Sequence, residues 1–184
     1  PRFAHFPHIT GKEGEKLSKR LGSFGIPEIR NELQVEPISV WCVLGRLGTS
    51  EPVEALQHLD QLVDSFDLSK VSRTPPKFDP EDLLRLNARI LHHMPWDDVQ
   101  GRLKALGFAD MDEGFWTAVR PNITHLAEVK DWWHIAREVI SGAVTDAGFA
   151  AQAAALLPPE PWDATTWENW ITAIKSATGR KGKD

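Results

Sequence analysis

The chain has 184 residues with a formal net charge of −5, and its residues are 41% apolar and 26% charged. This composition is ordinary for a globular protein that buries a core, and it argues against a uniformly basic nucleic-acid binder. No apolar run reaches the ~20 residues of a membrane span, and the first ten residues lack the pattern of a signal peptide. The single cysteine, Cys42, excludes an internal disulfide and a cysteine-based zinc cluster, so we expect a cytoplasmic protein.

The N-terminal region is predicted to be a short extended segment, residues 3–7, that leads into a glycine-rich basic loop. The stretch GKEGEKLSKRLGS, residues 11–23, combines three glycines with Lys12, Lys16, Lys19 and Arg20. Glycines allow backbone amides to approach a polyanion, and lysine supplies a mobile positive charge. The charge pattern alone also fits a solvated surface loop, so phosphate binding and simple solvation both remain open.

Helices are predicted to follow this loop in close succession. Pro27 can open a helix that runs to Leu33, and Pro37 can open another that ends at Gly48. Ser50 is predicted to cap a third helix. Its expected buried stripe consists of Ala55, Leu56, Leu59, Leu62 and Val63.

The clearest helix signal begins at Asp79. This aspartate is a suitable N-cap, Pro80 suits the first helical position, and the acidic residues Glu81 and Asp82 complement the positive helix end. A broad apolar face follows, and Pro95 is predicted to end the helix.

Shorter, tryptophan-rich helices are predicted after residue 95. The last of them is expected to start with a capping box, Thr165 with Glu168, and to stop at Gly179. No segment alternates with a period of two residues, so we expect no strands and an all-α fold in two parts, residues 1–95 and 96–184. The predicted helices of the second part are 97–106, 112–119, 124–140, 149–157 and 165–177.

The residues from 16 to 20 resemble a known motif. Lys-Leu-Ser-Lys-Arg is similar to the second signature motif of class I aminoacyl-tRNA synthetases, in the variant typical of glutamyl-tRNA synthetases. The approach FAHFPHITGKEGE (3–15) and the block FDLSKVSRTPPKFDPEDLLRLN (66–87) resemble further segments of the same family in the same order. The chain is therefore identified as resembling the C-terminal portion of a glutamyl-tRNA synthetase from the KLSKR loop onward.

This resemblance implies a glutamate–tRNA ligase, which activates glutamate with ATP and Mg²⁺ as glutamyl-adenylate and transfers it to the tRNA for glutamate. Residues 1–95 would hold the KLSKR loop and a stem-contact helical region, and residues 96–184 a helical-bundle anticodon-binding domain that is incomplete at its C-terminus. The chain has no His-Ile-Gly-His-type motif and no doubly wound pattern. We therefore expect a portion that lacks the nucleotide-binding catalytic domain and, by itself, binds no cofactor and charges no tRNA. The full-length enzyme is expected to be a monomer without a membrane partner.

The resemblance also assigns roles within the loop. Lys19 matches the second lysine of the motif and would be the catalytic residue that binds the ATP phosphates and stabilises charge as pyrophosphate leaves. Lys16 would be a secondary phosphate contact, Ser18 would shape the loop, and Leu17 and Arg20 complete the ATP-loop motif. No metal-binding residues are predicted.

Several conspicuous residues are predicted to be structural. Trp167, Trp170, Ile171 and Ile174 share one helical face and are expected in a core, whereas one of the adjacent Trp132 and Trp133 should face outward. His92 and His93 lack the partners of a metal site, and Cys42 has the apolar neighbours of an inert thiol. His5 and His8 near the loop, and the basic tail Arg180, Lys181 and Lys183, fit either solvation or a contact with a phosphate-bearing ligand.

A second interpretation comes from a different functional class. The chain would be a stand-alone helical adaptor that binds protein or RNA through its tryptophan-rich half, with the basic loop merely solvated. Binding of tRNA that weakens steeply with salt would favour the first interpretation over the second.

Overall fold

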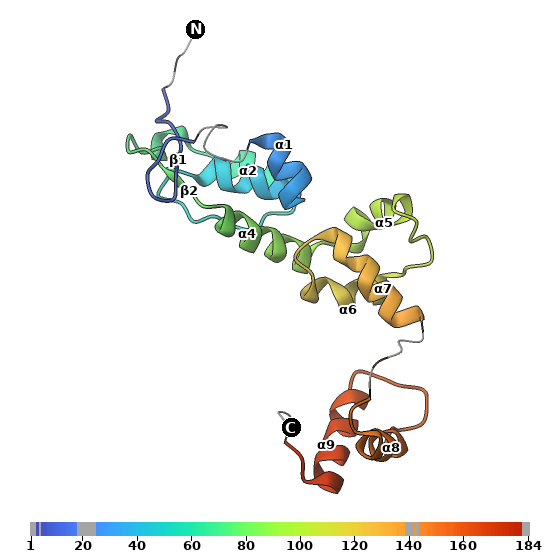
Figure 1. The fold of residues 1–184 in the computed structure, drawn as a ribbon. Helices are drawn as coiled ribbons and strands as arrows, with labels where there is room; N and C mark the ends of the chain where they lie inside the picture. Colours follow the sequence, from blue (N-terminus) through green and yellow to red (C-terminus); the bar gives the residue numbers. More distant parts are fainter. Residues whose placement is uncertain (1–2, 4, 18–24, 139–141, 143, 182–184) are drawn as a thin grey trace. The chain divides into compact units, whose positions relative to one another are not determined.

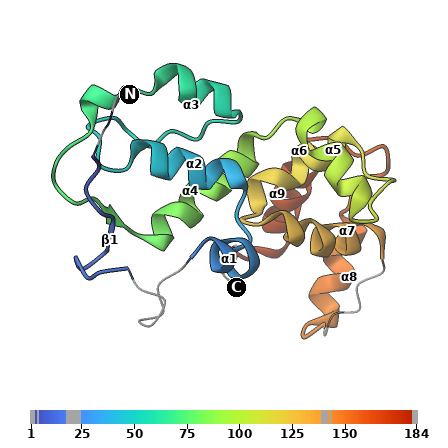
Figure 2. The same cartoon turned by 90° about the horizontal axis from the view of Figure 1, so that it is seen from above.

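The computed structural model describes residues 3, 5–17, 25–138, 142 and 144–181. In these residues helices dominate, which confirms the all-α prediction, and the chain forms two compact units, Pro1–Glu138 and Val139–Asp184 (Figure 1; Figure 2 shows the same ribbon from above). None of the described helices is long and apolar enough to cross a membrane.

The first unit contains one strand pair that the sequence did not predict. Strand β1 (Thr10–Gly11) runs parallel to β2 (Lys77–Phe78), with Thr10 opposite Lys77. The Thr10 amide also donates to the carbonyl oxygen of Pro76 at 2.9 Å. Two-residue strands are too short to produce a period-two pattern, so the expectation of no strands was wrong here.

The next helices lie where the prolines predicted them. Helix α1 (Ile26–Glu28) continues as a π-helical turn (Ile29–Leu33), and α2 (Pro37–Arg46) follows with its proline in the first turn. Gly48 has a φ of 79°, a conformation that ends a helix at little cost for glycine.

The third predicted helix begins later than expected. Helix α3 (Leu59–Ser65) starts after His58, so Ser50 caps nothing and residues 50–58 are irregular. The cause is the Gln61 side chain, whose Oε1 accepts the amide protons of Gln57 and His58, each at 3.0 Å. The predicted buried stripe is therefore only partly confirmed, because Leu62 is buried whereas Leu59 and Val63 are exposed. A short 3₁₀ turn, Leu68–Lys70, follows.

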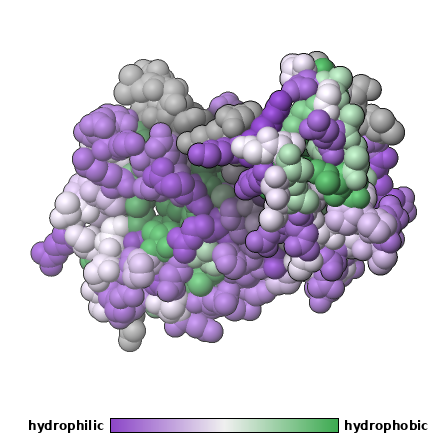
Figure 3. All heavy atoms as spheres, turned by 90° about the horizontal axis from the view of Figure 1, so that it is seen from below, coloured by the Kyte–Doolittle hydropathy of each residue, from purple (hydrophilic) through white to green (hydrophobic). Residues whose placement is uncertain are grey.

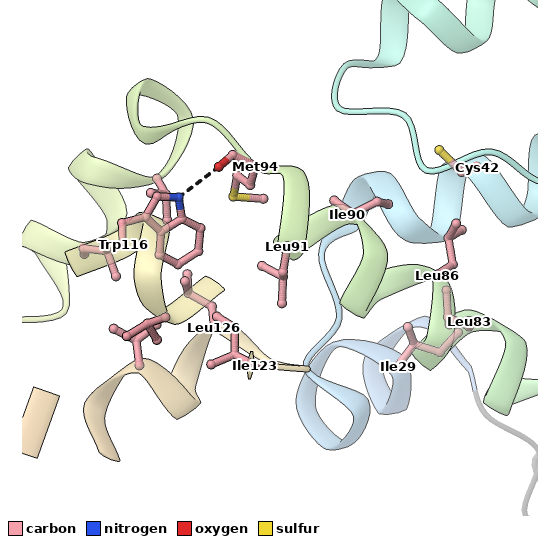
Figure 4. Packing of buried hydrophobic residues seen from close by; sticks show 14 of the residues in the cluster. Ile29, Cys42, Leu83, Leu86, Ile90, Leu91, Met94, Trp116, Ile123 and Leu126 are labelled. Atoms are coloured by element: carbon pink, nitrogen blue, oxygen red, sulfur yellow. Dashed lines mark hydrogen bonds between the residues drawn. The ribbon is translucent and has the colours of Figure 1, made fainter. Parts of the chain in front are cut away.

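Helix α4 (Pro80–His93) forms the centre of the first unit and confirms its predicted start. The Asp79 carboxylate accepts from the Glu81 amide at 2.9 Å, as an N-cap does. Figure 4 shows the apolar side chains of α4 along the cluster, with Leu83 near Ile29 and Leu86 between Leu83 and Cys42. Met94, directly after α4, lies near Trp116. One core thus continues past residue 95, and the indole of Trp116 donates to the Met94 carbonyl at 2.9 Å.

The helices after α4 complete the first unit. Helices α5 (Trp96–Ala105) and α6 (Glu113–Val119) agree with the predictions, and a 3₁₀ turn, Arg120–Asn122, follows. The helix predicted from residue 124 starts later, as a 3₁₀ turn (Leu126–Glu128) and then α7 (Val129–Arg137). The Glu128 carboxylate accepts from both the amide and the hydroxyl of Thr124, at 2.9 and 2.7 Å, which holds residues 124–125 outside the helix.

The second unit contains α8 (Ala147–Ala155) and α9 (Thr166–Thr178). Thr165 is the N-cap residue of α9, as predicted, but the predicted capping box is wrong, because the Thr165 side chain makes no cap hydrogen bond. The Asp163 carboxylate instead accepts from the Thr165 and Thr166 amides at 2.8 and 3.0 Å. Helix α8 likewise starts two residues before the predicted 149, since Asp146 is its cap. Gly179 ends α9 with a φ of 71°, as predicted.

Candidate phosphate-binding loop

The chain reverses direction directly before the KLSKR motif. The Gly11 amide donates to the Glu15 carbonyl, and the Gly14 amide to the Gly11 carbonyl, each at 2.9 Å. Gly14 has a φ of 88°, which favours glycine at this turn. An antiparallel bridge between Thr10 and Lys16 closes the turn and holds the Lys16 backbone beside β1, while its side chain is exposed.

Leu17 anchors the loop to the core of the first unit. It is half-buried and packs against the main apolar cluster. Leu17 and Gly25, which flank residues 18–24, both line one apolar cavity of about 190 Å³ whose floor includes Phe78 and Val43. The motif therefore begins at a fixed point on the protein surface.

Lys12 forms ion pairs with two carboxylates among the described residues. Its Nζ lies 2.9 Å from Oδ2 of Asp79 and 3.8 Å from Oε2 of Glu81. The hydrogen bond between Lys12 and Asp79 raises the pKa of the lysine and lowers the pKa of the carboxyl below its usual range. Lys12 thus ties the turn to the start of α4, and it is not equivalent to Lys16.

This ion pair predicts a pH-dependent stability. The pKa of Asp79 is lowered in the folded protein, so its stabilisation is fully present above the unfolded value of about 3.9 and is lost as the pH falls through the folded value. The difference in melting temperature between the wild type and Asp79→Ala should therefore be constant near neutral pH and shrink below about pH 4. Thermal unfolding followed by circular dichroism at several pH values measures this difference.

The exposed Asp64 on α3 provides the control. Asp64→Ala should leave the melting temperature nearly unchanged throughout the pH series. If the difference in melting temperature between the wild type and Asp79→Ala stays constant down to pH 2, the charge of the Asp79 carboxylate contributes nothing to stability.

Only two of the five predicted ATP-loop residues lie among the described residues. Lys16 and Leu17 are placed as above, whereas Ser18, Lys19 and Arg20 lie outside the described residues. Their roles in ATP binding therefore stay predictions. His5 and His8 lie on the surface.

The other titratable candidates contact backbone carbonyls or are buried. His92 lies 3.0 Å from the Ile123 carbonyl and His93 lies 2.8 Å from the Arg89 carbonyl. No group of three potential metal ligands occurs among the residues that the structure describes. Cys42 is fully buried, and burial raises the pKa of its thiol, which disfavours the reactive thiolate.

The tryptophans depart from the predictions in two places. Trp132 and Trp133 are both half-buried against the apolar cluster, so neither faces fully outward. They can share a core because Trp133 packs edge-on against Phe115, with ring centroids 4.9 Å apart. Trp167 was expected in a core, yet 66% of it is exposed, because α8 and α9, the helices among the described residues of the second unit, leave it uncovered.

Comparison with known proteins gives matches along the whole chain. No protein-family model matches it. It is 49% identical over 184 residues to the glutamate–tRNA ligase of Azospirillum brasilense and 47% identical over 184 residues to glutamate–tRNA ligase 2 of Methylobacterium sp. (strain 4-46), with all of this chain and 41% of each relative covered. The chain thus spans about two fifths of the length of these relatives, and the resemblance inferred from the KLSKR motif is confirmed.

Solved structures show the same fold. A glutamate tRNA ligase from Elizabethkingia meningosepticum, solved in complex with its amino acid, matches with a TM-score of 0.70 at 18% identity. The match covers 98% of this chain and 43% of that one. The glutamate-tRNA synthetase of Elizabethkingia anophelis matches with a TM-score of 0.64 at 18% identity over the same shares of the two chains.

Proposed function

The chain is homologous along its whole length to the C-terminal part of glutamate–tRNA ligases, and from this we propose that it serves as the tRNA-binding part of such a ligase. The observation that carries the proposal is the 49% identity over all 184 residues. The ligase would couple glutamate to its tRNA through glutamyl-adenylate at the expense of ATP. By itself the 184-residue chain is expected to charge no tRNA.

We propose further that the KLSKR loop completes the ATP site of that ligase. Lys19 would bind the ATP phosphates, with Mg²⁺ as the accompanying ion, and Lys16 would make a secondary contact. The geometry around the motif supports this arrangement, because the closed turn before Lys16 and the anchored Leu17 give the loop a fixed origin. A positioned cation that faces developing negative charge accelerates phosphoryl-group chemistry.

The two parts of the chain are proposed to contact different regions of the tRNA for glutamate. Residues 1–95 would contact the stem, and the helices of residues 96–184 would contact the anticodon region. The ligase is proposed to be a monomeric cytoplasmic enzyme. The buried apolar cluster that spans residue 95 supports a rigid connection between the stem-contact part and the helices that follow it up to Glu138.

Filter binding of the 184-residue chain to the tRNA for glutamate tests this proposal. Phosphate contacts release counterions, so the binding constant should fall linearly with salt on a logarithmic plot, with a slope of about −0.9 for each contacted phosphate in a duplex. A tRNA for an unrelated amino acid is the control and should bind more weakly at every salt concentration. Absence of binding at about 50 mM salt, or binding that salt does not change, would contradict a tRNA-binding role for this chain.

A further inference from the structure

The second unit carries an open groove lined by tryptophan, in a region to which the proposed loop chemistry gives no role. The groove has a volume of about 460 Å³ and lies between the segment that leads into α9 and the first turns of that helix. We call it the tryptophan groove. Its lining residues are Leu157, Trp162, Asp163, Thr166, Trp167 and Trp170.

Two of the three indoles are largely exposed. Trp162 is 56% exposed and Trp167 is 66% exposed, whereas Trp170 is half-buried. On the face drawn in Figure 3, apolar residues (green) also reach the surface in separate patches among hydrophilic ones. Large apolar side chains gathered in a groove mark binding surfaces more often than single exposed ones do.

Hydrogen bonds and ring packing fix the positions of the tryptophan side chains without a ligand. The Trp162 indole donates to the Pro158 carbonyl at 2.9 Å, and the Trp170 indole donates to the Ala153 carbonyl at 2.7 Å. Trp167 packs edge-on against Trp170, with ring centroids 5.5 Å apart. Since the N–H groups of Trp162 and Trp170 are already occupied, these two indoles offer a ligand their aromatic faces rather than donors.

The charge of the groove selects the ligand. The stretch LPPEPWDATTWENW, residues 157–170, contains Glu160, Asp163 and Glu168 and no lysine, arginine or histidine. Asp163 accepts from the Thr165 and Thr166 amides at the start of α9, whereas Glu160 and Glu168 are exposed and form no hydrogen bond or ion pair with any described residue. This charge repels phosphate and attracts cations, so the groove disfavours RNA.

Aromatic faces add to the attraction for cations. The negative face of an indole binds a guanidinium or ammonium group that lies within about 6 Å of the ring centroid. The same chain uses this contact twice, with Arg137 4.4 Å above the Trp133 ring and Arg180 4.2 Å above the Phe149 ring. Both of those rings already have an arginine, whereas the groove faces have none among the described residues.

We propose that the tryptophan groove binds an arginine- or lysine-bearing segment of a partner protein. The cationic side chain lies over the Trp162 or Trp167 face. Asp163 in the lining, and the exposed Glu160 and Glu168 that neighbour the lining residues in the sequence, attract flanking positive charges. The groove lies within residues 96–184, which are proposed to contact the anticodon region, but it repels phosphate, so the tRNA contacts of this part would use other faces.

The test uses the whole 184-residue chain and the indole ¹⁵N–¹H signals of its tryptophans. The probe is a nine-residue peptide of repeated Gly-Arg-Ser, and the comparison peptide has glutamine in place of each arginine. The arginine peptide should shift the Trp162, Trp167 and Trp170 signals in a saturable manner, and Trp167→Ala should weaken its binding at least about fivefold. Trp41→Ala is the matched control, because Trp41 is a 55% exposed tryptophan of the first unit and its loss should leave binding unchanged.

A second variant tests the exposed acidic residues Glu160 and Glu168 and leaves Asp163 unchanged. The double change Glu160→Gln and Glu168→Gln should weaken binding of the arginine peptide about threefold or more at low salt and leave α9 folded. Three results would overturn the proposal: equal shifts with the glutamine peptide, no saturable shift with the arginine peptide at millimolar concentration, or a single-stranded RNA hexamer that shifts the same indole signals more strongly. If the arginine peptide does not bind the groove but the chain still binds the tRNA for glutamate, the proposed ligase role is unaffected.

Discussion

Replacing Lys19 by alanine is expected to slow glutamyl-adenylate formation by about 10²- to 10³-fold. The lysine of the KLSKR loop is proposed to face the ATP phosphates, where negative charge develops as pyrophosphate departs. Loss of one positioned charge in such a site removes stabilisation that the transition state needs more than the bound substrate does. The change should therefore act mainly on turnover, with a smaller effect on the KM for ATP.

ATP–pyrophosphate exchange measures this effect in the chain joined in frame to the N-terminal part of the Azospirillum brasilense ligase. Lys12→Ala is the matched control, because it removes the same charge from the same basic segment. The Lys12 ammonium already lies 2.9 Å from the Asp79 carboxylate, so its loss should change exchange only a few-fold. Exchange by Lys19→Ala within a few-fold of the wild type would remove the catalytic role assigned to this lysine.

Replacing Asn87 by alanine is expected to lower the free energy of unfolding by about 3–5 kcal/mol. Asn87 lies on the buried face of α4 and is fully buried. Its Oδ1 accepts from the Glu36 amide at 2.7 Å and from the Ser39 hydroxyl at 2.9 Å, and its Nδ2 donates to the Thr124 carbonyl at 2.7 Å. Alanine would leave the buried Glu36 amide and the buried Ser39 hydroxyl without this acceptor, at a cost of about 1–3 kcal/mol for each group. It would also remove the donor to the carbonyl of the exposed Thr124.

Urea unfolding of the 184-residue chain, followed by circular dichroism, measures this loss. Asn122→Ala is the control, because Asn122 is exposed and its amide contacts only the Ala118 carbonyl at 3.2 Å. That change should alter stability by less than about 0.5 kcal/mol. Equal effects of the two changes would show that the buried network contributes nothing beyond an ordinary surface contact.

The Asn87 network matters because it joins elements on both sides of residue 95. Asn87 connects the start of α2 to Thr124, and the neighbouring Glu36 forms a two-pronged ion pair with Arg102 of α5 at 2.7 and 2.8 Å. Glu36 is buried, so this pair is shielded on one side from water. Together these bonds hold the proposed stem-contact part and the following helices in one orientation.

Local signals in the sequence were sufficient for most helix boundaries. Asp79, Asp112 and Gly179 mark helix ends in the structure, because a cap bonds to backbone groups only two to four residues away. The KLSKR motif similarly lies within five consecutive residues, so the resemblance to glutamyl-tRNA synthetases could be detected without any tertiary contact. The apolar spacing of α4 was also visible, because one buried face repeats every three to four residues.

Contacts between distant residues decided the rest. The strand pair joins Thr10 to Lys77, far away along the chain. The late start of α3 is an exception, because the Gln61 side chain bonds to amides only three and four residues away, and this local signal was missed. Asn87 looked like any polar residue on a helix until its three partners, 37 to 51 residues away, made it the centre of a buried network. Lys12 and Lys16 looked alike, and only the folded position of Asp79 separated them. The sequence by itself thus determined most of the helices and the resemblance to glutamyl-tRNA synthetases, because their signals are local. The roles of individual polar side chains depended on which distant partners the fold placed within hydrogen-bonding distance.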